Sequence, residues 1–151
     1  MNDDLEDLYQ QVILDHSKRP RNYGEIAGAV HVHGDNPSCG DEIALHVKFS
    51  ADGGVEDIKF TGSGCAISQA SASIMTMKLK SKPRAEAGRL LGNFKTLVTS
   101  DTEPDTTGLG DAVLLRGVRK FPQRVKCAML AWRAFEQALG EGGEVTTEGP
   151  G

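Results

Sequence analysis

The sequence contains no long hydrophobic run and no recognisable export signal. Its longest apolar stretches are a few residues, whereas a membrane-spanning helix needs about 20. The start, MNDDLEDLYQQ, is acidic and polar, without the basic and apolar regions of a secretory signal. We therefore expect a cytoplasmic protein that neither binds nor crosses a membrane.

Clustered positive charge is also scarce. The 17 basic side chains are outnumbered by 21 acidic ones, which gives a net charge of −4. Because phosphate groups attract clustered Lys and Arg, this balance argues against a nucleic-acid partner. The exception is the short basic patch SKRPRN at residues 17–22, which is either a contact surface or a solvated helix end.

Cysteine is rare, with three residues and no CxxC pair. An odd number of cysteines in a chain without an export signal argues against a disulfide framework. Metal binding or thiol chemistry is the better expectation, although the spacing is not that of a zinc finger.

The 151 residues suffice for one domain with its own core. Apolar spacing predicts a helix at 4–18, strands at 29–34, 43–49 and 55–60, and helices beginning near 65, at 83 and at 122. The short connections between the strands predict an antiparallel meander with one buried face. We expect an α+β fold, with a small antiparallel three-stranded sheet covered by helices over residues 1–139. Residues 140–151 have little to bury, and we expect a disordered C-terminal tail there.

Four side chains of metal-ligand type stand out: Cys39 and Asp41 lie in the loop between the first two predicted strands, Cys65 lies at the turn after the third strand, and Cys127 lies within the last predicted helix. The loop before the second strand and the end of the third strand lie at the same end of a meander, and the last helix can pack across that end. Three thiolates and one carboxylate suit tetrahedral zinc, which would also keep the thiols deprotonated. The hard carboxylate is the weaker ligand in such a set, so the site is suited to ligand exchange.

Buried cysteines often only fill a core, and spacing alone leaves that alternative open. The flanking residues favour the metal site, because Cys39 and Cys65 follow Gly-, Ser- and Pro-containing segments typical of loops. Arg124 could orient Asp41 or lie on a solvated helix face. Lys126 is expected on the surface.

None of the four histidines is expected to bind metal. His31 and His33 lie two apart on one strand face, without other ligand-type residues near them in sequence, so we expect exposed strand residues. His46 falls on the polar side of the second strand. His16 ends the first helix, where a cation would suit the helix dipole.

Four segments make the sequence resemble a known family. In chain order they are LYQQVILDHSKRPRNYG, NPSCGDEI, FTGSGCAISQASASIM and FPQRVKCAMLAW, and they resemble the SufU branch of the IscU/NifU-N superfamily. Two features favour that branch over the iron–sulfur scaffold IscU. Residues 83–117 look like the extra segment of SufU-type proteins, and Lys126 stands before the last cysteine where the scaffold branch has histidine.

The resemblance implies that Cys39, Asp41, Cys65 and Cys127 hold zinc. It also implies a SufS-type cysteine desulfurase as partner, a pyridoxal-phosphate enzyme that forms a persulfide from cysteine, with a SufBCD-type scaffold downstream. Under this interpretation the protein is a zinc-dependent sulfurtransferase of iron–sulfur cluster assembly. Cys39 accepts the sulfur, with Cys127 as the second choice, and Asp41 holds the zinc meanwhile. The patch at 17–22 becomes a candidate docking surface.

Two alternatives remain open from the sequence. Thiolate ligands also suit a scaffold on which a [2Fe–2S] cluster is assembled and then transferred, although Lys126 counts against it. Zinc could instead only stabilise the fold and a docking surface.

Overall fold

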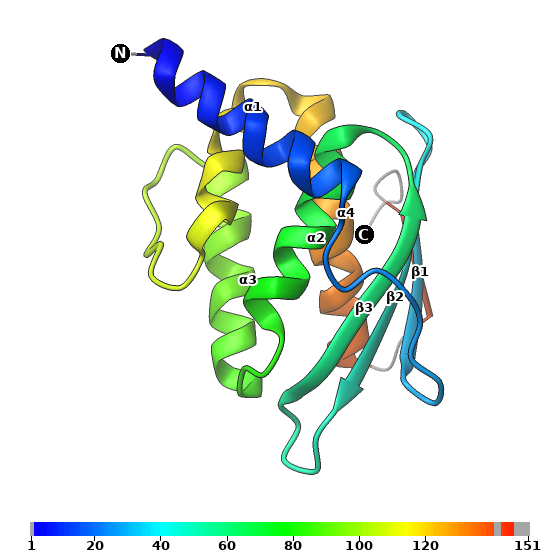
Figure 1. The fold of residues 1–151 in the computed structure, drawn as a ribbon. Helices are drawn as coiled ribbons and strands as arrows, with labels where there is room; N and C mark the ends of the chain where they lie inside the picture. Colours follow the sequence, from blue (N-terminus) through cyan, green and yellow to red (C-terminus); the bar gives the residue numbers. More distant parts are fainter. Residues whose placement is uncertain (1, 141–142, 147–151) are drawn as a thin grey trace.

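The computed structural model describes residues 2–140 and 143–146, with side chains described from residue 10 to residue 140. The elements, in chain order, are α1 (Asn2–Lys18), β1 (Val30–Asn36), β2 (Asp41–Phe49), β3 (Val55–Ser63), α2 (Ala66–Leu79), α3 (Arg84–Thr99), the 3-10 helix η1 (Gly110–Lys120), α4 (Pro122–Gly140) and β4 (Gly143–Thr146). Figure 1 shows the helices on one side of the sheet. None of the helices in this described part is both long and apolar enough to cross a bilayer.

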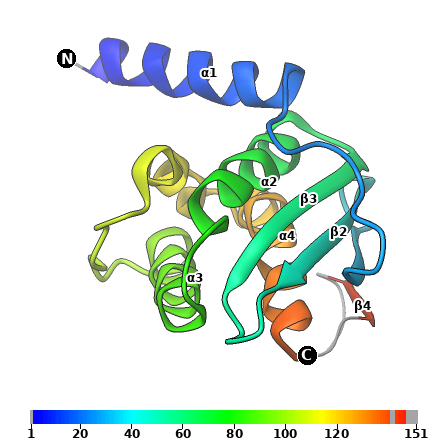
Figure 2. The same cartoon turned by 60° about the horizontal axis from the view of Figure 1, so that its bottom comes forward.

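The three-stranded antiparallel meander predicted from the sequence is confirmed. β2 pairs antiparallel with β1 on one side and with β3 on the other. Alternate residues point inward, so that Val32, Leu45 and Phe60 are fully buried. Helices α2 and α4 cover this face (Figure 2), because their small and apolar side chains let them approach the strands closely. The α+β fold class follows directly.

A fourth strand corrects the expectation of a disordered tail at 140–151. Gly143–Thr146 forms β4, which pairs in parallel with β1, so the sheet order is β3-β2-β1-β4. No apolar pattern in the sequence predicts this strand, because an edge strand can be held by backbone hydrogen bonds without apolar side chains. The other residues of that tail, 141–142 and 147–151, lie outside the described residues.

The opposite edge of the sheet is covered by the segment after α1. The backbone N–H of Gly24 donates to the carbonyl of Phe60 at 2.8 Å, and the N–H of Phe60 donates to the carbonyl of Asn22 at 3.1 Å. The Tyr23 hydroxyl continues the pairing at Gly62. These bonds satisfy backbone groups of β3 that would otherwise face solvent.

His16 differs from the sequence expectation of a cation at a helix end. Its side chain is buried between α1 and α2, with Nδ1 2.7 Å from the Ser73 hydroxyl. Burial, followed by the charge of Arg21, lowers the pKa of His16. The imidazole is therefore a neutral part of the helix interface, and its charge does not serve the helix dipole.

The segment between α3 and α4, where no helix was predicted, contains a 3-10 helix. Residues 110–120 form η1, which buries Ala112, Leu115 and Val118 against the neighbouring helices. Glycine and charged residues interrupt the apolar residues of this segment, so its sequence does not show the regular apolar spacing of a helix. The helix α4 begins at Pro122 as predicted, since proline suits a first helical turn.

Candidate metal centre

The four predicted ligands come from three places that meet at one end of the sheet. Asn36, the last residue of β1, lies opposite Asp41, the first residue of β2, so the tight connection of residues 37–40 carries Cys39 at this end. Gly40 has a φ of +70°, a left-handed conformation that glycine adopts without strain. β3 also terminates at this end of the sheet and leads through Gly64 to Cys65.

Three of the four side chains converge closely. One ligand atom each of Cys39, Asp41 and Cys127 lies within 4.8 Å of the other two. The Sγ atoms of Cys39 and Cys127 are 3.4 Å apart. Cys65 borders this group, with its Sγ 3.9 Å from Oδ2 of Asp41. Residues 88 positions apart are thus brought together, as the predicted meander and last helix required.

Asp41 is held rigidly although it is a buried carboxylate. Its side chain is 1% exposed. The backbone N–H of Cys65 donates to Oδ1 at 2.8 Å, and the Asn36 amide donates to Oδ2 at 3.2 Å. Buried charge is costly unless it is paired or hydrogen-bonded, so these two donors make the position tenable.

Asn36 is a site residue that the sequence analysis missed. It is fully buried, and its amide nitrogen also lies 3.5 Å from the Cys127 sulfur, which it can reach as a donor. The same amide therefore contacts two predicted ligands. Its position three residues before Cys39, at the start of a Pro-containing turn, was the available signal, since asparagine often caps such turns.

Gly64 is required by the close approach of Asp41. Its φ of +142° is one that side-chain-bearing residues rarely adopt. A Cβ at this position would lie 2.8 Å from the Asp41 Cα and would collide with the carboxylate. Cys65 then caps α2, where its Sγ accepts the backbone N–H of Ser68 at 3.4 Å.

Cys127 is buried on the inner face of α4, at 3% exposure. The helix is fixed nearby, because the Ser71 hydroxyl of α2 donates to the Ala128 carbonyl at 2.6 Å. Burial, followed by hydrogen bonding with Cys39, raises the pKa of the Cys127 thiol. A thiol in such surroundings stays protonated unless a cation compensates the thiolate.

The donor set fits a zinc ion chemically. Two or three thiolates with a carboxylate match the ligand types that zinc takes at about 2.0–2.3 Å. A positive ion would also offset the burial that disfavours the Cys127 thiolate. Exposure differs sharply within the set, because Cys39 is exposed, Cys65 is half-buried and Cys127 is buried.

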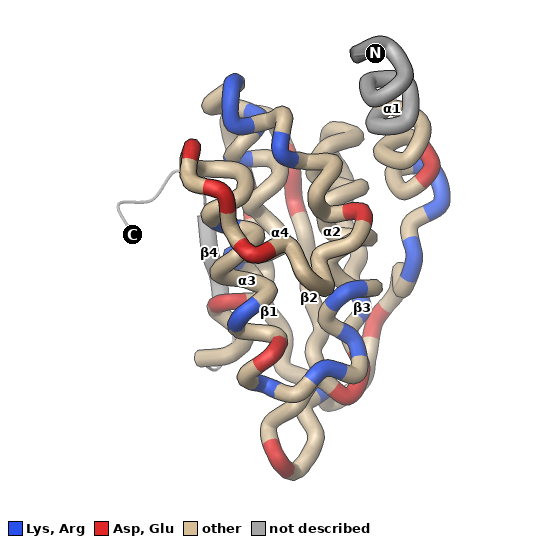
Figure 3. The backbone as a smooth tube through the Cα atoms, turned by 90° about the vertical axis from the view of Figure 1, so that its left-hand side faces the viewer, with Lys and Arg blue, Asp and Glu red and all other residues tan. Residues whose placement is uncertain are grey.

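Of the charged residues singled out near Cys127, Arg124 is exposed, and Lys126, which was expected on the surface, is half-buried. The hydrogen bonds that position Asp41 come from Asn36 and Cys65. In the basic patch, Arg21 pairs with Asp15 at 2.6 Å and Arg19 pairs with the same carboxylate at 3.4 Å. Figure 3 shows these basic residues where the chain leaves α1. Asp15 therefore offsets part of the positive charge of the patch.

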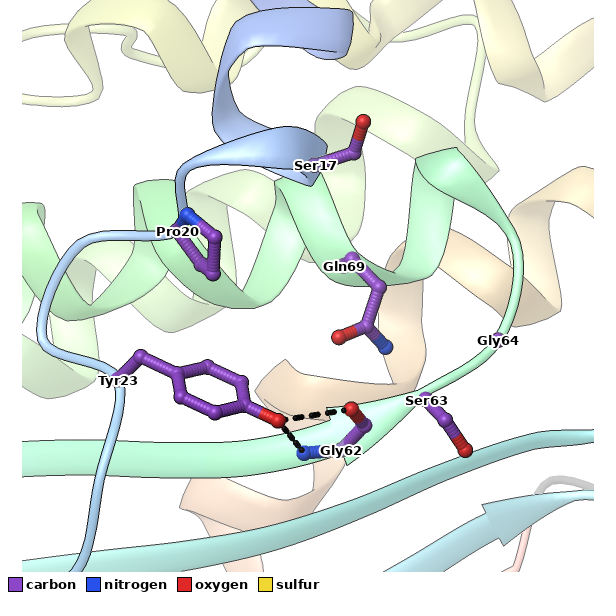
Figure 4. A pocket seen from close by; sticks show the side chains of 7 residues that line it. All are labelled: Ser17, Pro20, Tyr23, Gly62, Ser63, Gly64 and Gln69. Atoms are coloured by element: carbon purple, nitrogen blue, oxygen red, sulfur yellow. Dashed lines mark hydrogen bonds between the residues drawn. The ribbon is translucent and has the colours of Figure 1, made fainter.

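A pocket lies between this patch and Gly64, the residue before Cys65. It lies between the end of α1, the end of β3 and the start of α2, and Gly64 forms part of its wall beside Cys65 (Figure 4). The other lining residues are Ser17, Pro20, Tyr23, Gly62, Ser63 and Gln69. They offer hydroxyl, amide and backbone groups together with the apolar ring of Pro20, which suit contact with another chain better than acid–base chemistry.

Comparison with known proteins places the chain among assembly factors. The family model for the NifU-like N-terminal domain matches residues 8–128. The chain is 47% identical to an iron–sulfur cluster assembly scaffold protein IscU of Streptococcus pyogenes serotype M1, over 89% of the chain and 84% of that protein. It is 45% identical to the zinc-dependent sulfurtransferase SufU of Bacillus subtilis strain 168, over 94% and 97%. A solved structure from Fervidobacterium islandicum AW-1, described as a candidate cluster-assembly scaffold for the SUF system, superposes with a TM-score of 0.80 at 38% identity, covering 85% of the chain and 94% of that structure.

Proposed function

The chain belongs to the family of NifU-like N-terminal domains, which act in iron–sulfur cluster assembly, and from this premise we propose that it is a zinc-dependent sulfurtransferase. It accepts persulfide sulfur from a SufS-type cysteine desulfurase. The name of the Bacillus relative, which matches almost the whole chain, supports both the zinc and the transfer.

The observation that carries the proposal is the difference in exposure among the cysteines. Cys39 is exposed in a loop, whereas Cys127, whose sulfur lies 3.4 Å away, is buried in a helix. Thiol exchange requires the attacking sulfur to reach its target, so access selects Cys39 as the acceptor. Cys65 and Cys127 would remain as anchors together with Asp41.

Zinc would be held by Cys39, Asp41, Cys65 and Cys127. When bound, it keeps the cysteine sulfurs as thiolates at neutral pH and shields them from oxidation. The hydrogen bonds of Asp41 with Cys65 and Asn36 fix the carboxylate whether or not Cys39 moves. This arrangement lets the exposed Cys39 leave the zinc while the other three ligands keep their places.

The transfer step is a thiol–persulfide exchange without net oxidation. The Cys39 thiolate attacks the outer sulfur of the persulfide on the desulfurase cysteine. A new S–S bond forms at Cys39 Sγ, the bond between the outer sulfur and the desulfurase cysteine breaks, and the electron pair leaves with that cysteine as a thiolate. The sulfur is then available to a SufBCD-type scaffold.

The surface beside the centre supports a protein partner. The pocket between α1, β3 and α2 and the patch at residues 17–22 adjoin Gly64, so a chain docked there would lie next to the turn that leads into Cys65. We assign the desulfurase contact to this side of the molecule.

A desulfurase assay with matched variants tests the proposal. The zinc-loaded chain is mixed with a SufS-type desulfurase, cysteine and a reductant, and alanine formation is followed. Wild type should stimulate the rate strongly. Cys39→Asp, which retains an anionic ligand but has no sulfur, should bind zinc yet give no stimulation. Gln123→Ala, on the exposed first turn of α4, should behave like wild type. Equal stimulation by wild type and Cys39→Asp would remove Cys39 as the acceptor.

The scaffold alternative is favoured by a different observation, the name of the Streptococcus relative. The same three cysteines and Asp41 would then hold a [2Fe–2S] cluster as cargo. Anaerobic reconstitution with iron and sulfide tests this alternative. A stable visible chromophore, lost in Cys127→Ala, would support the scaffold, and a colourless protein that keeps its zinc would reject it.

A further inference from the structure

A pair of histidines lies on the outer face of the sheet, away from the cysteine centre. His31 of β1 stands directly opposite His46 of β2, and the two rings lie with centroids 4.7 Å apart. Their neighbours Val32 and Leu45 point to the buried face, so the histidines point to the face that α2 and α4 leave uncovered. The pair is five residues along the strands from Asn36 and Asp41, or about 16 Å.

We propose that His31 and His46 form a second metal site, for a divalent transition-metal ion of the kind that prefers imidazole. Zinc, nickel and copper belong to this class, whereas magnesium and calcium favour oxygen ligands. The site is independent of the sulfur chemistry, since it shares no residue with the cysteine centre.

The spacing of the rings fits a shared ion. With metal–nitrogen bonds of about 2.0–2.1 Å, two imidazoles that meet at an ion at roughly 90–109° have centroids about 4.5–5.2 Å apart. The observed 4.7 Å falls in this range. The ring planes are 25° apart, so binding requires the rings to turn about χ2, a torsion that is broad for histidine.

The surroundings of His46 act on ion binding in two opposite ways. Its ring has a backbone hydrogen bond with Ile26, which must loosen when the ring turns toward a shared ion, so this contact weakens binding. The Glu25 carboxylate acts on His46 and adds negative charge nearby, which favours a bound cation.

Two neighbours set limits on the affinity and supply a control. Lys59 of β3 stands opposite His46 and adds positive charge, so we expect weaker binding than at the cysteine centre. His33 lies on the same face of β1, but alanine stands opposite it, and its ring nitrogen is 3.9 Å from the Glu42 carboxylate. It therefore shares the face of His31 without having an imidazole across the strand, although it is half-buried and His31 is exposed.

Nickel titration of the full chain tests the site. The chain is first loaded with one equivalent of zinc, so that the cysteine centre is filled, and nickel chloride is then added in a calorimeter. We expect one nickel site in wild type and in His33→Asn. His31→Asn and His46→Asn should each weaken binding by at least about tenfold. Equal affinity in all four proteins, or no binding by wild type, would overturn the proposal.

A second measurement on wild type does not depend on any substitution. In an NMR spectrum of the histidine side chains, substoichiometric nickel should broaden the resonances of His31 and His46 and leave those of His16 unchanged. Broadening of His33 without His31 and His46, or broadening of His16 equal to theirs, would contradict the assigned pair.

Discussion

The carboxylate of Asp41 accepts a hydrogen bond from the backbone N–H of Cys65 at 2.8 Å. This bond joins the first residue of β2 to the residue that caps α2, and Asn36 adds a second bond from the end of β1. One side chain thus fixes the relative positions of the segments that carry Cys39 and Cys65. Asp41 therefore has a task in the fold in addition to its proposed ligation of zinc.

Two substitutions at Asp41 separate these tasks. Asp41→Asn keeps an oxygen for the Cys65 N–H but loses the charge, so we expect a folded protein whose zinc affinity falls at least about tenfold. Asp41→Ala leaves the backbone N–H of Cys65 without this acceptor and removes one partner of Asn36, so it should also lower the free energy of unfolding of the metal-free chain by about 1–3 kcal/mol. Chelator competition and urea denaturation measure the two effects. Equal stability of both variants would contradict the assigned bond.

Gly64→Ala should damage the centre without touching a ligand. The added Cβ collides with Asp41 and forces a strained φ, so we expect loss of zinc affinity together with lower stability. The matched control is Gly88→Ala in α3, where the added Cβ meets open space. That change should leave zinc binding unaltered and raise stability by about 0.5–1 kcal/mol. Similar zinc affinity in the two variants would refute the close contact.

The sequence was sufficient to predict the meander and the convergence of Cys39, Asp41 and Cys65 because the relevant signals are local. Alternating apolar residues fixed the inward face of β1–β3, and the short turns required antiparallel neighbours. In such a meander, one end of the sheet contains the end of β1, the start of β2 and the end of β3. This arrangement brings Cys39, Asp41 and Cys65 together.

Other features depend on contacts that no local pattern reveals. The strand β4 is held by backbone pairing with β1, and its own residues carry no strand-like alternation. Asn36 is a site residue because its amide points inward to Asp41 and Cys127, a direction set by tertiary packing. His16 was expected to be charged, but packing of α1 on α2 buried it.

The buried His16 makes stability depend on pH in a defined sense. Its pKa is lowered from the ordinary value of 6.5, so the unfolded chain binds the proton more tightly than the folded one. Its contribution is fully present above pH 6.5 and is lost as the pH falls from there through the lowered pKa. Protonated His16 would also lie near Arg21 and Lys78, which disfavour it.

The measurement is the change in unfolding free energy between about pH 7.5 and pH 5 for wild type and His16→Gln. Wild type and the variant share every other titratable group, so the difference between the two changes isolates His16. We expect wild type to lose more stability than the variant. Identical losses would show that His16 is not neutral in the folded protein.

Removal of the residues after Gly140 should loosen the β1 edge of the sheet without changing zinc binding or sulfur transfer. A chain ending at Gly140 lacks β4, so backbone amides of β1 should exchange hydrogen faster. The cysteine centre is built from β1–β3, α2 and α4, and we therefore expect unchanged zinc content and unchanged stimulation of the desulfurase. Loss of stimulation in the shortened chain would give the tail a part in transfer.

The most direct measurement locates the transferred sulfur. The zinc-loaded chain is incubated with a SufS-type desulfurase and cysteine, its thiols and persulfides are trapped by alkylation, and the peptides are examined by mass spectrometry. We predict one additional sulfur on Cys39 in wild type and none on any cysteine of Cys39→Asp. An additional sulfur on Cys127 or Cys65, with Cys39 unmodified, would contradict it.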